Sequence, residues 1–256
     1  MIKKTKFPKI SIITVVLNND KTIERCINSV INQKYPNKKI EHIIIDGGSK
    51  DSTVSIIKRY RNKITYWHSK KDKGLFDAMN IGIKKSSGNI IGILNSDDYF
   101  NKNALKIVSS YFSKYKIDFL FGSVKKNRIY HNFFPKKLWY TFNIYPSHSV
   151  SFFINKYAQK KIGKYNIKFK YSSDRDLIYR IIRNKNLKEI STKKNEILGT
   201  FSMSGLSSKI SFYQKISEEF KIRLANKESL FQIIVVMVVF SFYHFLKKLK
   251  KEIVKI

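Results

Sequence analysis

Runs of apolar residues alternate with amphipathic stretches through the first half of the chain. Residues 10–16 and 40–45 are continuous runs rich in β-branched side chains, which is typical of strands buried on both faces of a sheet. Between them, Ile23, Ile27 and Val30 recur at the spacing of one helix face. The same reasoning predicts strands at residues 64–67, 90–94, 119–121 and 197–201, and helices around residues 54–58, 74–85, 103–115 and 174–183.

Strands that alternate with helices of this length form βαβ units, so the pattern predicts an α/β fold with a mostly parallel sheet. Right-handed crossovers place the loops that follow the strands along one edge of that sheet. After about residue 124 the rhythm loosens and aromatic residues become frequent. We therefore predict one domain over residues 1–208, divided into parts at 1–123 and 124–208, and a helical tail at 209–256.

The most hydrophobic stretch of this tail is residues 230–246. As a helix, its 17 residues would extend roughly 25 Å, less than the roughly 30 Å of a membrane's hydrocarbon core. We favour a helix that lies in the membrane interface with lysines on anionic head groups. A spanning helix, which would carry one basic flank across the membrane, and a core or dimer helix are the alternatives. The basic flanks are Lys215, Lys221, Arg223 and Lys227 before the stretch, and Lys247, Lys248, Lys250 and Lys251 after it.

The composition points to an anionic partner. The 256 residues include 51 Lys and Arg against 18 Asp and Glu, and the resulting net charge of +33 attracts nucleic acid, anionic lipid or phosphorylated substrates. Because the lysines are scattered and no nucleic-acid recognition motif accompanies them, we expect a membrane surface and no nucleic acid. A single cysteine, Cys26, and an N-terminal apolar run without a cleavage site favour the cytoplasm.

Aspartates lie where predicted strands end, although the chain is otherwise poor in carboxylates. Asp46 directly follows the strand at 40–45 and precedes Gly47 and Gly48. A carboxylate there could accept a hydrogen bond from a ring N–H or a ribose hydroxyl, and the glycines would let a flat base come close. The alternative is that Asp46 only caps the next helix, although Asp51 is better placed for that role.

A second group, Asn95, Asp97 and Asp98, follows the strand at 90–94. Adjacent carboxylates repel each other unless a cation lies beside them. Mg²⁺ or Mn²⁺ bridging to phosphate oxygens would remove that repulsion and neutralise a diphosphate leaving group. The alternative is a solvated turn, which Asn, Ser and Asp commonly form.

A third group, Asp174 and Asp176, begins the predicted helix at 174–183. Acids in the first turn of a helix interact favourably with the helix dipole, and this structural role is one interpretation. A carboxylate at a helix start could also serve as the general base that a sugar hydroxyl needs when it attacks an anomeric carbon. The spacing does not choose between the two.

Four segments together resemble the family-2 glycosyltransferases, which bind nucleotide-diphospho-sugars with a GT-A fold. The resemblance covers residues 9–98 and extends more loosely to Gly205. It implies a mostly parallel, Rossmann-like sheet flanked by helices, with a C-terminal helical extension. The third segment is similar to that of enzymes that build capsule, O-antigen and exopolysaccharide repeat units in bacteria, and the fourth to the family's metal-binding D-x-D region. The segments are SIITVVLN at 11–18, EHIIIDGGSKDST at 41–53, DKGLFDAMNIG at 72–82 and GILNSDD at 92–98.

The resemblance also implies a role for each matching position. Asp97, with Asp98 beside it, would bind Mn²⁺ or Mg²⁺, and Asp174 would be the acceptor-side base in the pattern DRDLIYR. The expected substrate-binding residues are Thr14, Asn18 and Asp46 at the nucleoside, Asp72 and Asn80 near the base or sugar, Asn95, Asp97 and Asp176 within the motifs, and His148 and Gly205 as acceptor or diphosphate contacts.

The chain departs from the family pattern at Asn95, which replaces the first acid of D-x-D, and at Ser173, where many relatives carry a glutamate. The Gln-x-x-Arg-Trp signature of polymerising members is missing, which favours a single addition. The resemblance thus implies inverting, metal-dependent transfer from a nucleotide-diphospho-sugar, with UDP the expected nucleotide, to a glycan or lipid-linked acceptor in surface polysaccharide synthesis. Because Asn95 removes one anionic ligand, the alternative is a catalytically idle, membrane-associated protein of the same fold.

Overall fold

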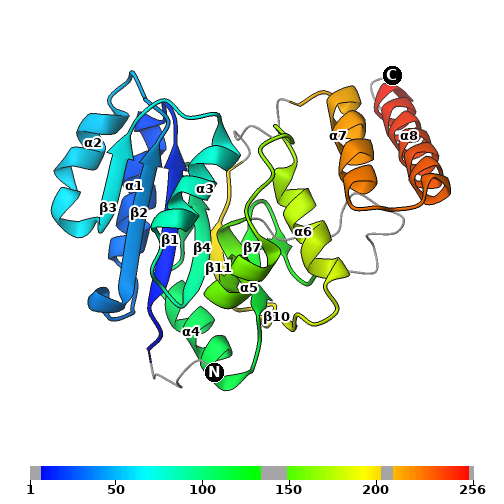
Figure 1. Cartoon of the computed structure of the whole chain (residues 1–256). Coiled ribbons are helices and arrows are strands. Elements are labelled where there is room, and N and C mark those ends of the chain that lie inside the picture. Colours follow the sequence, from blue (N-terminus) through cyan, green and yellow to red (C-terminus); the bar gives the residue numbers. More distant parts are fainter. Residues whose placement is uncertain (1–6, 134–148, 203–209, 254–256) are drawn as a thin grey trace.

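Figure 1 shows the computed structural model of the chain, which describes residues 7–133, 149–202 and 210–253. A central sheet carries helices on both faces. Two further helices, α7 (Phe212–Ala225) and α8 (Leu230–Ile253), lie side by side at the far side of α6 (Ser173–Arg183). The α/β fold with a C-terminal helical extension is therefore confirmed.

Among the described residues, seven strands form the central sheet in the order β10-β6-β9-β4-β1-β2-β3. Every neighbouring pair is parallel except the two that include β9, which runs against β4 and β6. The prediction of a mostly parallel sheet is therefore confirmed. The strands are β1 (Ile10–Val16), β2 (Ile40–Asp46), β3 (Tyr66–Ser69), β4 (Ile90–Asn95), β6 (Phe119–Phe121), β9 (Phe152–Asn155) and β10 (Glu189–Ser191).

A smaller sheet, in the order β5-β11-β7-β8, adjoins the end of β4. Its strands are β5 (Tyr99–Phe100), β7 (Ser123–Lys125), β8 (Ile129–Tyr130) and β11 (Ile197–Thr200). The remaining helices are α1 (Asp20–Ile31), α2 (Thr53–Arg59), α3 (Leu75–Lys85), α4 (Ala104–Lys114) and α5 (Lys156–Ile162), with 3₁₀ turns η1 (Asn37–Lys39), η2 (Arg61–Lys63) and η4 (Ser149–Ser151).

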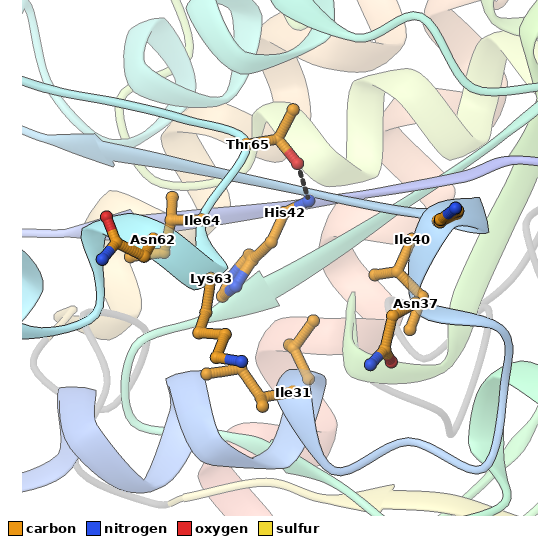
Figure 2. A pocket seen from close by; sticks show the side chains of 10 residues that line it. Ile31, Asn37, Ile40, His42, Asn62, Lys63, Ile64 and Thr65 are labelled. Carbon is orange, nitrogen blue, oxygen red and sulfur yellow. Dashed lines mark hydrogen bonds between the residues drawn. The ribbon is translucent and has the colours of Figure 1, made fainter.

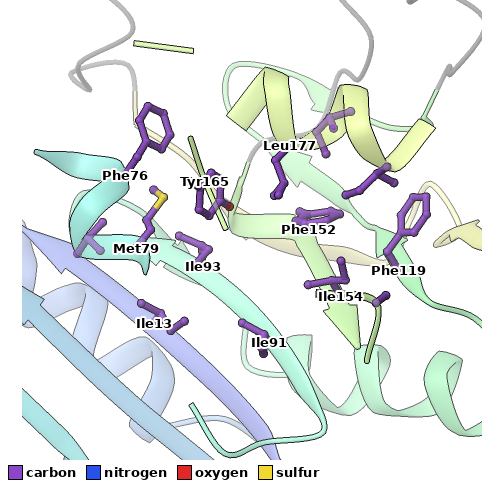
Figure 3. Close-up of a cluster of buried hydrophobic side chains, with 14 of the residues drawn as sticks. Ile13, Phe76, Met79, Ile91, Ile93, Phe119, Phe152, Ile154, Tyr165 and Leu177 are labelled. Carbon is purple, nitrogen blue, oxygen red and sulfur yellow. The ribbon is translucent and has the colours of Figure 1, made fainter. Parts of the chain in front are cut away.

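Apolar side chains bury both faces of the central sheet. Side chains of β1 alternate between the faces, so Ile13 packs with α3 and α6 in one cluster, whereas Ile12 packs with α1 and α4 in another. Figure 3 shows the first cluster, in which Phe76 and Met79 of α3 and Leu177 of α6 meet the sheet from the same side. Burial on both faces explains why these strands are continuous apolar runs.

The tail is less buried than the rest of the chain. Among the described side chains of α8, Ile233 and Val236 are buried, whereas Phe231 is 78% exposed. The alternative of a core helix is therefore wrong. No helix within the described residues is both long enough and apolar enough to cross a membrane. Arg223, predicted to belong to the basic flank, is instead fully buried, because Glu219 and Glu228 bind its guanidinium group.

Candidate functional site

Asp46 ends β2 at the carboxyl edge of the central sheet and is fully buried. Its Oδ2 accepts hydrogen bonds from the backbone N–H groups of Gly48 (3.1 Å) and Ser49 (3.0 Å) and from the hydroxyl of Ser69 (2.6 Å). Its Oδ1 accepts one from the hydroxyl of Ser49 (2.5 Å). The carboxylate thus orders the loop after β2, while Asp51 accepts the amide at the start of α2. Contact between Asp46 and a nucleoside stays a prediction.

Asn18 connects the loops after β1 and β2. Its backbone N–H donates to the hydroxyl of Ser49 (2.7 Å), and its Oδ1 accepts from the N–H of Lys50 (2.8 Å). It adopts φ 48°, a left-handed conformation that Asn tolerates better than most residues. Thr14 instead points into the interior, where its hydroxyl lies 3.0 Å from Nε2 of His42. The nucleoside contacts expected of Asn18 and Thr14 stay predictions.

Asp72 lies against the loop that Asp46 orders. A Cβ on Gly47 would come within 2.9 Å of Asp72 Oδ2, so the absence of a side chain at Gly47 is what lets this carboxylate approach. Burial raises the pKa of Asp72, and the charges of Asp77 and Asp46 raise it further, while a hydrogen bond from Gly74 N–H (2.7 Å) opposes them. Asp46 and Asp72 therefore form one negative region that suits ring N–H groups, ribose hydroxyls or a cation.

The loop after β4 holds the predicted metal-binding residues. Asp98 is buried and its Oδ1 accepts the N–H of Ser202 (2.9 Å), so it fastens the chain after β11. Asp97 is half-buried, and its backbone carbonyl accepts a hydrogen bond from Arg25 Nη2 (2.8 Å). Asn95 Nδ2 donates to the hydroxyl of Ser149 (3.1 Å) in η4. These contacts bring three separate segments together around one short loop.

One feature of the loop after β4 fits a hard divalent cation, and the sequence did not reveal it. Asn95 Oδ1 is buried and has no hydrogen-bond partner among the described residues. An unpaired buried oxygen is costly unless a ligand uses it, and an amide oxygen is an acceptable ligand for Mg²⁺ or Mn²⁺. No group of three or more His, Cys, Asp and Glu able to hold a metal occurs within the described residues.

On the acceptor side, Asp174 and Asp176 differ in environment. Asp174 is half-buried in the first turn of α6, close enough to Tyr165 that its charge, after burial, helps to raise the pKa of that hydroxyl. Asp176 is buried and binds Arg180 (2.9 Å) and Asn226 Nδ2 (3.0 Å). Both oxygens of Asp176 thus bind side chains inside the protein, and the substrate contact expected of Asp176 stays a prediction.

Asn80 also has an internal role. Its Nδ2 donates to the carbonyl of Tyr165 and its Oδ1 accepts the N–H of the same residue, both at 2.9 Å. This paired contact ties α3 to the segment before α6, and Phe76 stacks on the Tyr165 ring with a centroid distance of 5.5 Å. Contact between Asn80 and the donor stays a prediction. His148 and Gly205 lie outside the described residues.

Sequence reasoning missed several residues that shape this region. The hydroxyl of Ser69 binds Asp46 and the hydroxyl of Ser149 binds Asn95, across 23 and 54 positions of the chain. Isolated serines carry no pattern that could have identified them. The pairing of β2 with β3 places Ser69 opposite Asp46, a register that the strand predicted at residues 64–67 did not reveal.

A cavity of about 410 Å³ lies elsewhere, at the amino end of β2 (Figure 2). The ring of His42 points into the space between Lys63 and Ile31, and the backbone N–H of His42 donates to the hydroxyl of Thr65 (3.2 Å). Burial lowers the pKa of His42 to about 3, so its ring is neutral. None of the predicted site residues lines this cavity, which is therefore separate from the acid-rich edge.

Comparison with known proteins identifies relatives by sequence. The model of "Glycosyl transferase family 2" matches residues 11–190. An uncharacterised glycosyltransferase of Mycobacterium tuberculosis is 40% identical over 97 residues, which cover 38% of this chain and 37% of that one. The poly(ribitol-phosphate) beta-N-acetylglucosaminyltransferase TarS of Staphylococcus aureus is 30% identical over 120 residues, which cover 46% of this chain and 21% of TarS. The chain thus matches well under half the length of these relatives.

Solved structures agree in fold. The structure of TarS 1–349 in complex with UDP-GlcNAc superimposes with a TM-score of 0.65 at 18% identity, covering 89% of this chain and 70% of that one. A mannosyltransferase of Pyrobaculum calidifontis in complex with GDP-Man and Mn²⁺ gives 0.64 at 13% identity, covering 94% and 71%. At such identities the likeness shows the shared GT-A fold and no more.

Proposed function

Since this chain belongs to glycosyltransferase family 2, we propose that it transfers one sugar at a time, with inversion, from a UDP-linked donor to a hydroxyl of a glycan or lipid-linked acceptor in surface polysaccharide synthesis. The observation that carries the proposal is the presence of Asp46 at the end of β2, and of Asp72 and Asp97 on the loops after β3 and β4, at the carboxyl edge of the sheet, where open α/β folds bind ligands. The UDP-GlcNAc in the related TarS structure supports the choice of nucleotide.

The donor half of the site has two parts. Asp72 would meet the nucleoside beside residues 47–49, the loop that the buried Asp46 orders and that Gly47 lets Asp72 approach. Asp97, with Asp98 and the unpaired Asn95 Oδ1 beside it, would hold Mn²⁺ or Mg²⁺, which when bound neutralises charge on the departing diphosphate. The hydrogen bond from Ser202 to Asp98 keeps this loop in place against β11.

The acceptor half depends on Asp174. Its carboxylate takes the proton from the acceptor hydroxyl while the hydroxyl oxygen forms a bond to the anomeric carbon of the sugar. The bond from that carbon to the phosphate oxygen breaks, and its electron pair leaves with UDP. A single displacement of this kind inverts the anomeric configuration, as the family resemblance leads us to expect.

The proposal is tested by UDP release from UDP-GlcNAc and other UDP-sugars in the presence of Mn²⁺. We expect Asp174→Asn to lower kcat by about 10²-fold to 10⁴-fold, a usual range for loss of a general base. Asp97→Asn should also lower kcat, because it removes a carboxylate from the proposed metal site. Glu24→Gln, which removes a half-buried carboxylate on α1 that pairs with Arg59, is the control and should retain full activity. Donor binding without turnover, equal in wild type and Asp174→Asn, would instead support the catalytically idle alternative.

We also propose that the protein binds the inner, cytoplasmic face of the cell membrane through α8. Exposed apolar side chains such as Phe231, Val238 and Phe242 cover much of this helix, and the chain's charge of +33 complements anionic lipid. Phe231→Asp combined with Val238→Asp should weaken sedimentation with phosphatidylglycerol vesicles more than 10-fold, since each exposed apolar side chain contributes on the order of 1–2 kcal/mol when buried. Tyr157→Asp, an exposed aromatic on α5, is the control. Equal sedimentation of both variants would contradict membrane binding by α8.

A further inference from the structure

The first turn of α6 is held by α7 through a buried ion-pair network. Arg175 Nε donates to Glu219 Oε2 at 2.7 Å, and Glu219 Oε1 accepts from Arg223 Nε at 2.8 Å. Glu219 is 1% exposed and Arg223 is fully buried. Arg223 also binds Glu228, whose carboxylate accepts the hydroxyl of Tyr179 in α6. Buried ion pairs are stable only when their geometry is good and further hydrogen bonds support them. The network therefore fixes α6 and α7 in one arrangement.

Contacts from α7 reach both sides of Asp174 in sequence. On the preceding side, the backbone N–H of Tyr171 donates to both carboxylate oxygens of Glu218 (3.1 and 3.0 Å). On the following side, Asn226 at the end of α7 donates to Asp176 Oδ1 (3.0 Å). Together with the pair between Arg175 and Glu219, three positions within six residues of chain are bound to the tail. Asp174 lies between them.

These contacts extend to the donor side through Arg180. Asp176 Oδ2 binds Arg180 Nη2 at 2.9 Å, and the guanidinium group of Arg180 donates to the carbonyls of Ile162 and Lys164 (2.8 Å for Lys164). The next residue, Tyr165, is the one whose backbone Asn80 binds. Hydrogen bonds, together with the peptide bond between Lys164 and Tyr165, therefore join the end of α7 to α3, on which the motif at residues 72–82 continues.

We propose that Glu219 and Asn226 are positioning residues for transfer: they hold the first turn of α6 so that Asp174 meets the acceptor hydroxyl. The inference rests on the proposed function, because it takes Asp174 as the base. The inference assigns α7 to the acceptor side of the site, although the sequence predicted a helical tail from residue 209. A base displaced by about 1 Å loses up to roughly 10²-fold in rate, so small movements of α6 matter.

The test compares Glu219→Gln and Asn226→Ala with Ser211→Ala. Ser211 caps α7 through a reciprocal pair with Gln214 and touches no residue of α6 in that contact, so its loss perturbs α7 alone. We expect both positioning variants to lower kcat about 10-fold to 100-fold with the KM for UDP-sugar unchanged, and Ser211→Ala to keep the wild-type kcat. A rise in donor KM, or an equal loss in Ser211→Ala, would overturn the proposal.

Hydrogen exchange measured on the same variants separates this inference from the proposed function. Amides at residues 173–177 should exchange faster in Glu219→Gln than in Ser211→Ala, whatever reaction the protein catalyses. Unchanged protection would show that Glu219 does not hold the first turn of α6, and would overturn the proposal. If protection falls while Asp174→Asn transfers sugar at the wild-type rate, then the assignment of Asp174 as base is wrong, and the catalytic part of this proposal is overturned with it.

Discussion

Glu41 provides a quantitative test of how the amino end of the sheet is held. Its buried carboxylate accepts hydrogen bonds from the hydroxyls of Ser11 and Ser87 (2.5 Å each) and from the N–H of Ser87 (2.7 Å), and it pairs with Lys9 Nζ (2.9 Å). Burial alone raises the pKa of Glu41, but these bonds outweigh it and lower the pKa from 4.5 to about 2. A fall of this size corresponds to about 3 kcal/mol of folding free energy in favour of the charged form.

The direction of the pKa shift determines the pH range in which this stability is lost. Because the pKa is lower in the folded chain than in the unfolded one, the contribution is complete above about pH 5 and is lost as the pH falls from there towards 2. Urea denaturation of wild type and Glu41→Gln should therefore differ by about 3 kcal/mol at pH 7, with the difference shrinking below pH 4. Glu24→Gln, at a half-buried carboxylate on α1 that pairs with Arg59, is the control for the loss of one carboxylate. A difference of equal size at pH 7 and pH 3 would refute the reasoning, because it would mean that the charge of Glu41 is not the cause.

Three further predictions concern packing and buried charge. In Gly82→Ala, the new Cβ would lie 2.2 Å from Ile13 Cγ2, so we expect the free energy of unfolding from urea denaturation to fall by about 1–3 kcal/mol. The same substitution should cost less in a chain that already carries Ile13→Ala, because the clashing methyl group is then absent. Arg223→Ala would leave two carboxylates, Glu219 and Glu228, buried without their cation, and should cost about 3–5 kcal/mol in urea denaturation. Burial raises the pKa of Cys26 far above its usual range, so a thiol reagent at pH 8 should modify it only as fast as the chain opens; rapid modification of the folded protein would contradict this.

The sequence predicted the parallel part of the fold well, because strands buried on both faces leave long apolar runs. The runs at residues 10–16 and 119–121 coincide with β1 and β6. The strand predicted at 64–67 lies instead at Tyr66–Ser69, since its position follows the pairing with β2 and not its own apolar residues. Strand β9 was not predicted, because four residues in an aromatic-rich region give no periodicity, and its antiparallel direction depends on distant partners.

The candidate site was predictable only as far as single motifs allow. The positions of Asp46 and the Asn95–Asp98 loop followed from the strands before them, because a strand end fixes where the next residue lies. The contacts of Asn80 and Asp176 did not, since their partners, Tyr165 and Asn226, are 85 and 50 positions away. Local sequence shows which polar side chain is present, whereas its partner is decided by tertiary packing.

The four hydrogen bonds on the Asp46 carboxylate have a thermodynamic consequence for any ligand that binds beside it. Residues 47–49 lose their conformational freedom when the protein folds, and not when a ligand arrives. Ordering a loop on binding costs entropy and opposes association, so this part of the protein should contribute almost no such cost. In calorimetry of nucleotide binding, the entropy change should then come mainly from the release of water and from the loss of torsional freedom in the ligand.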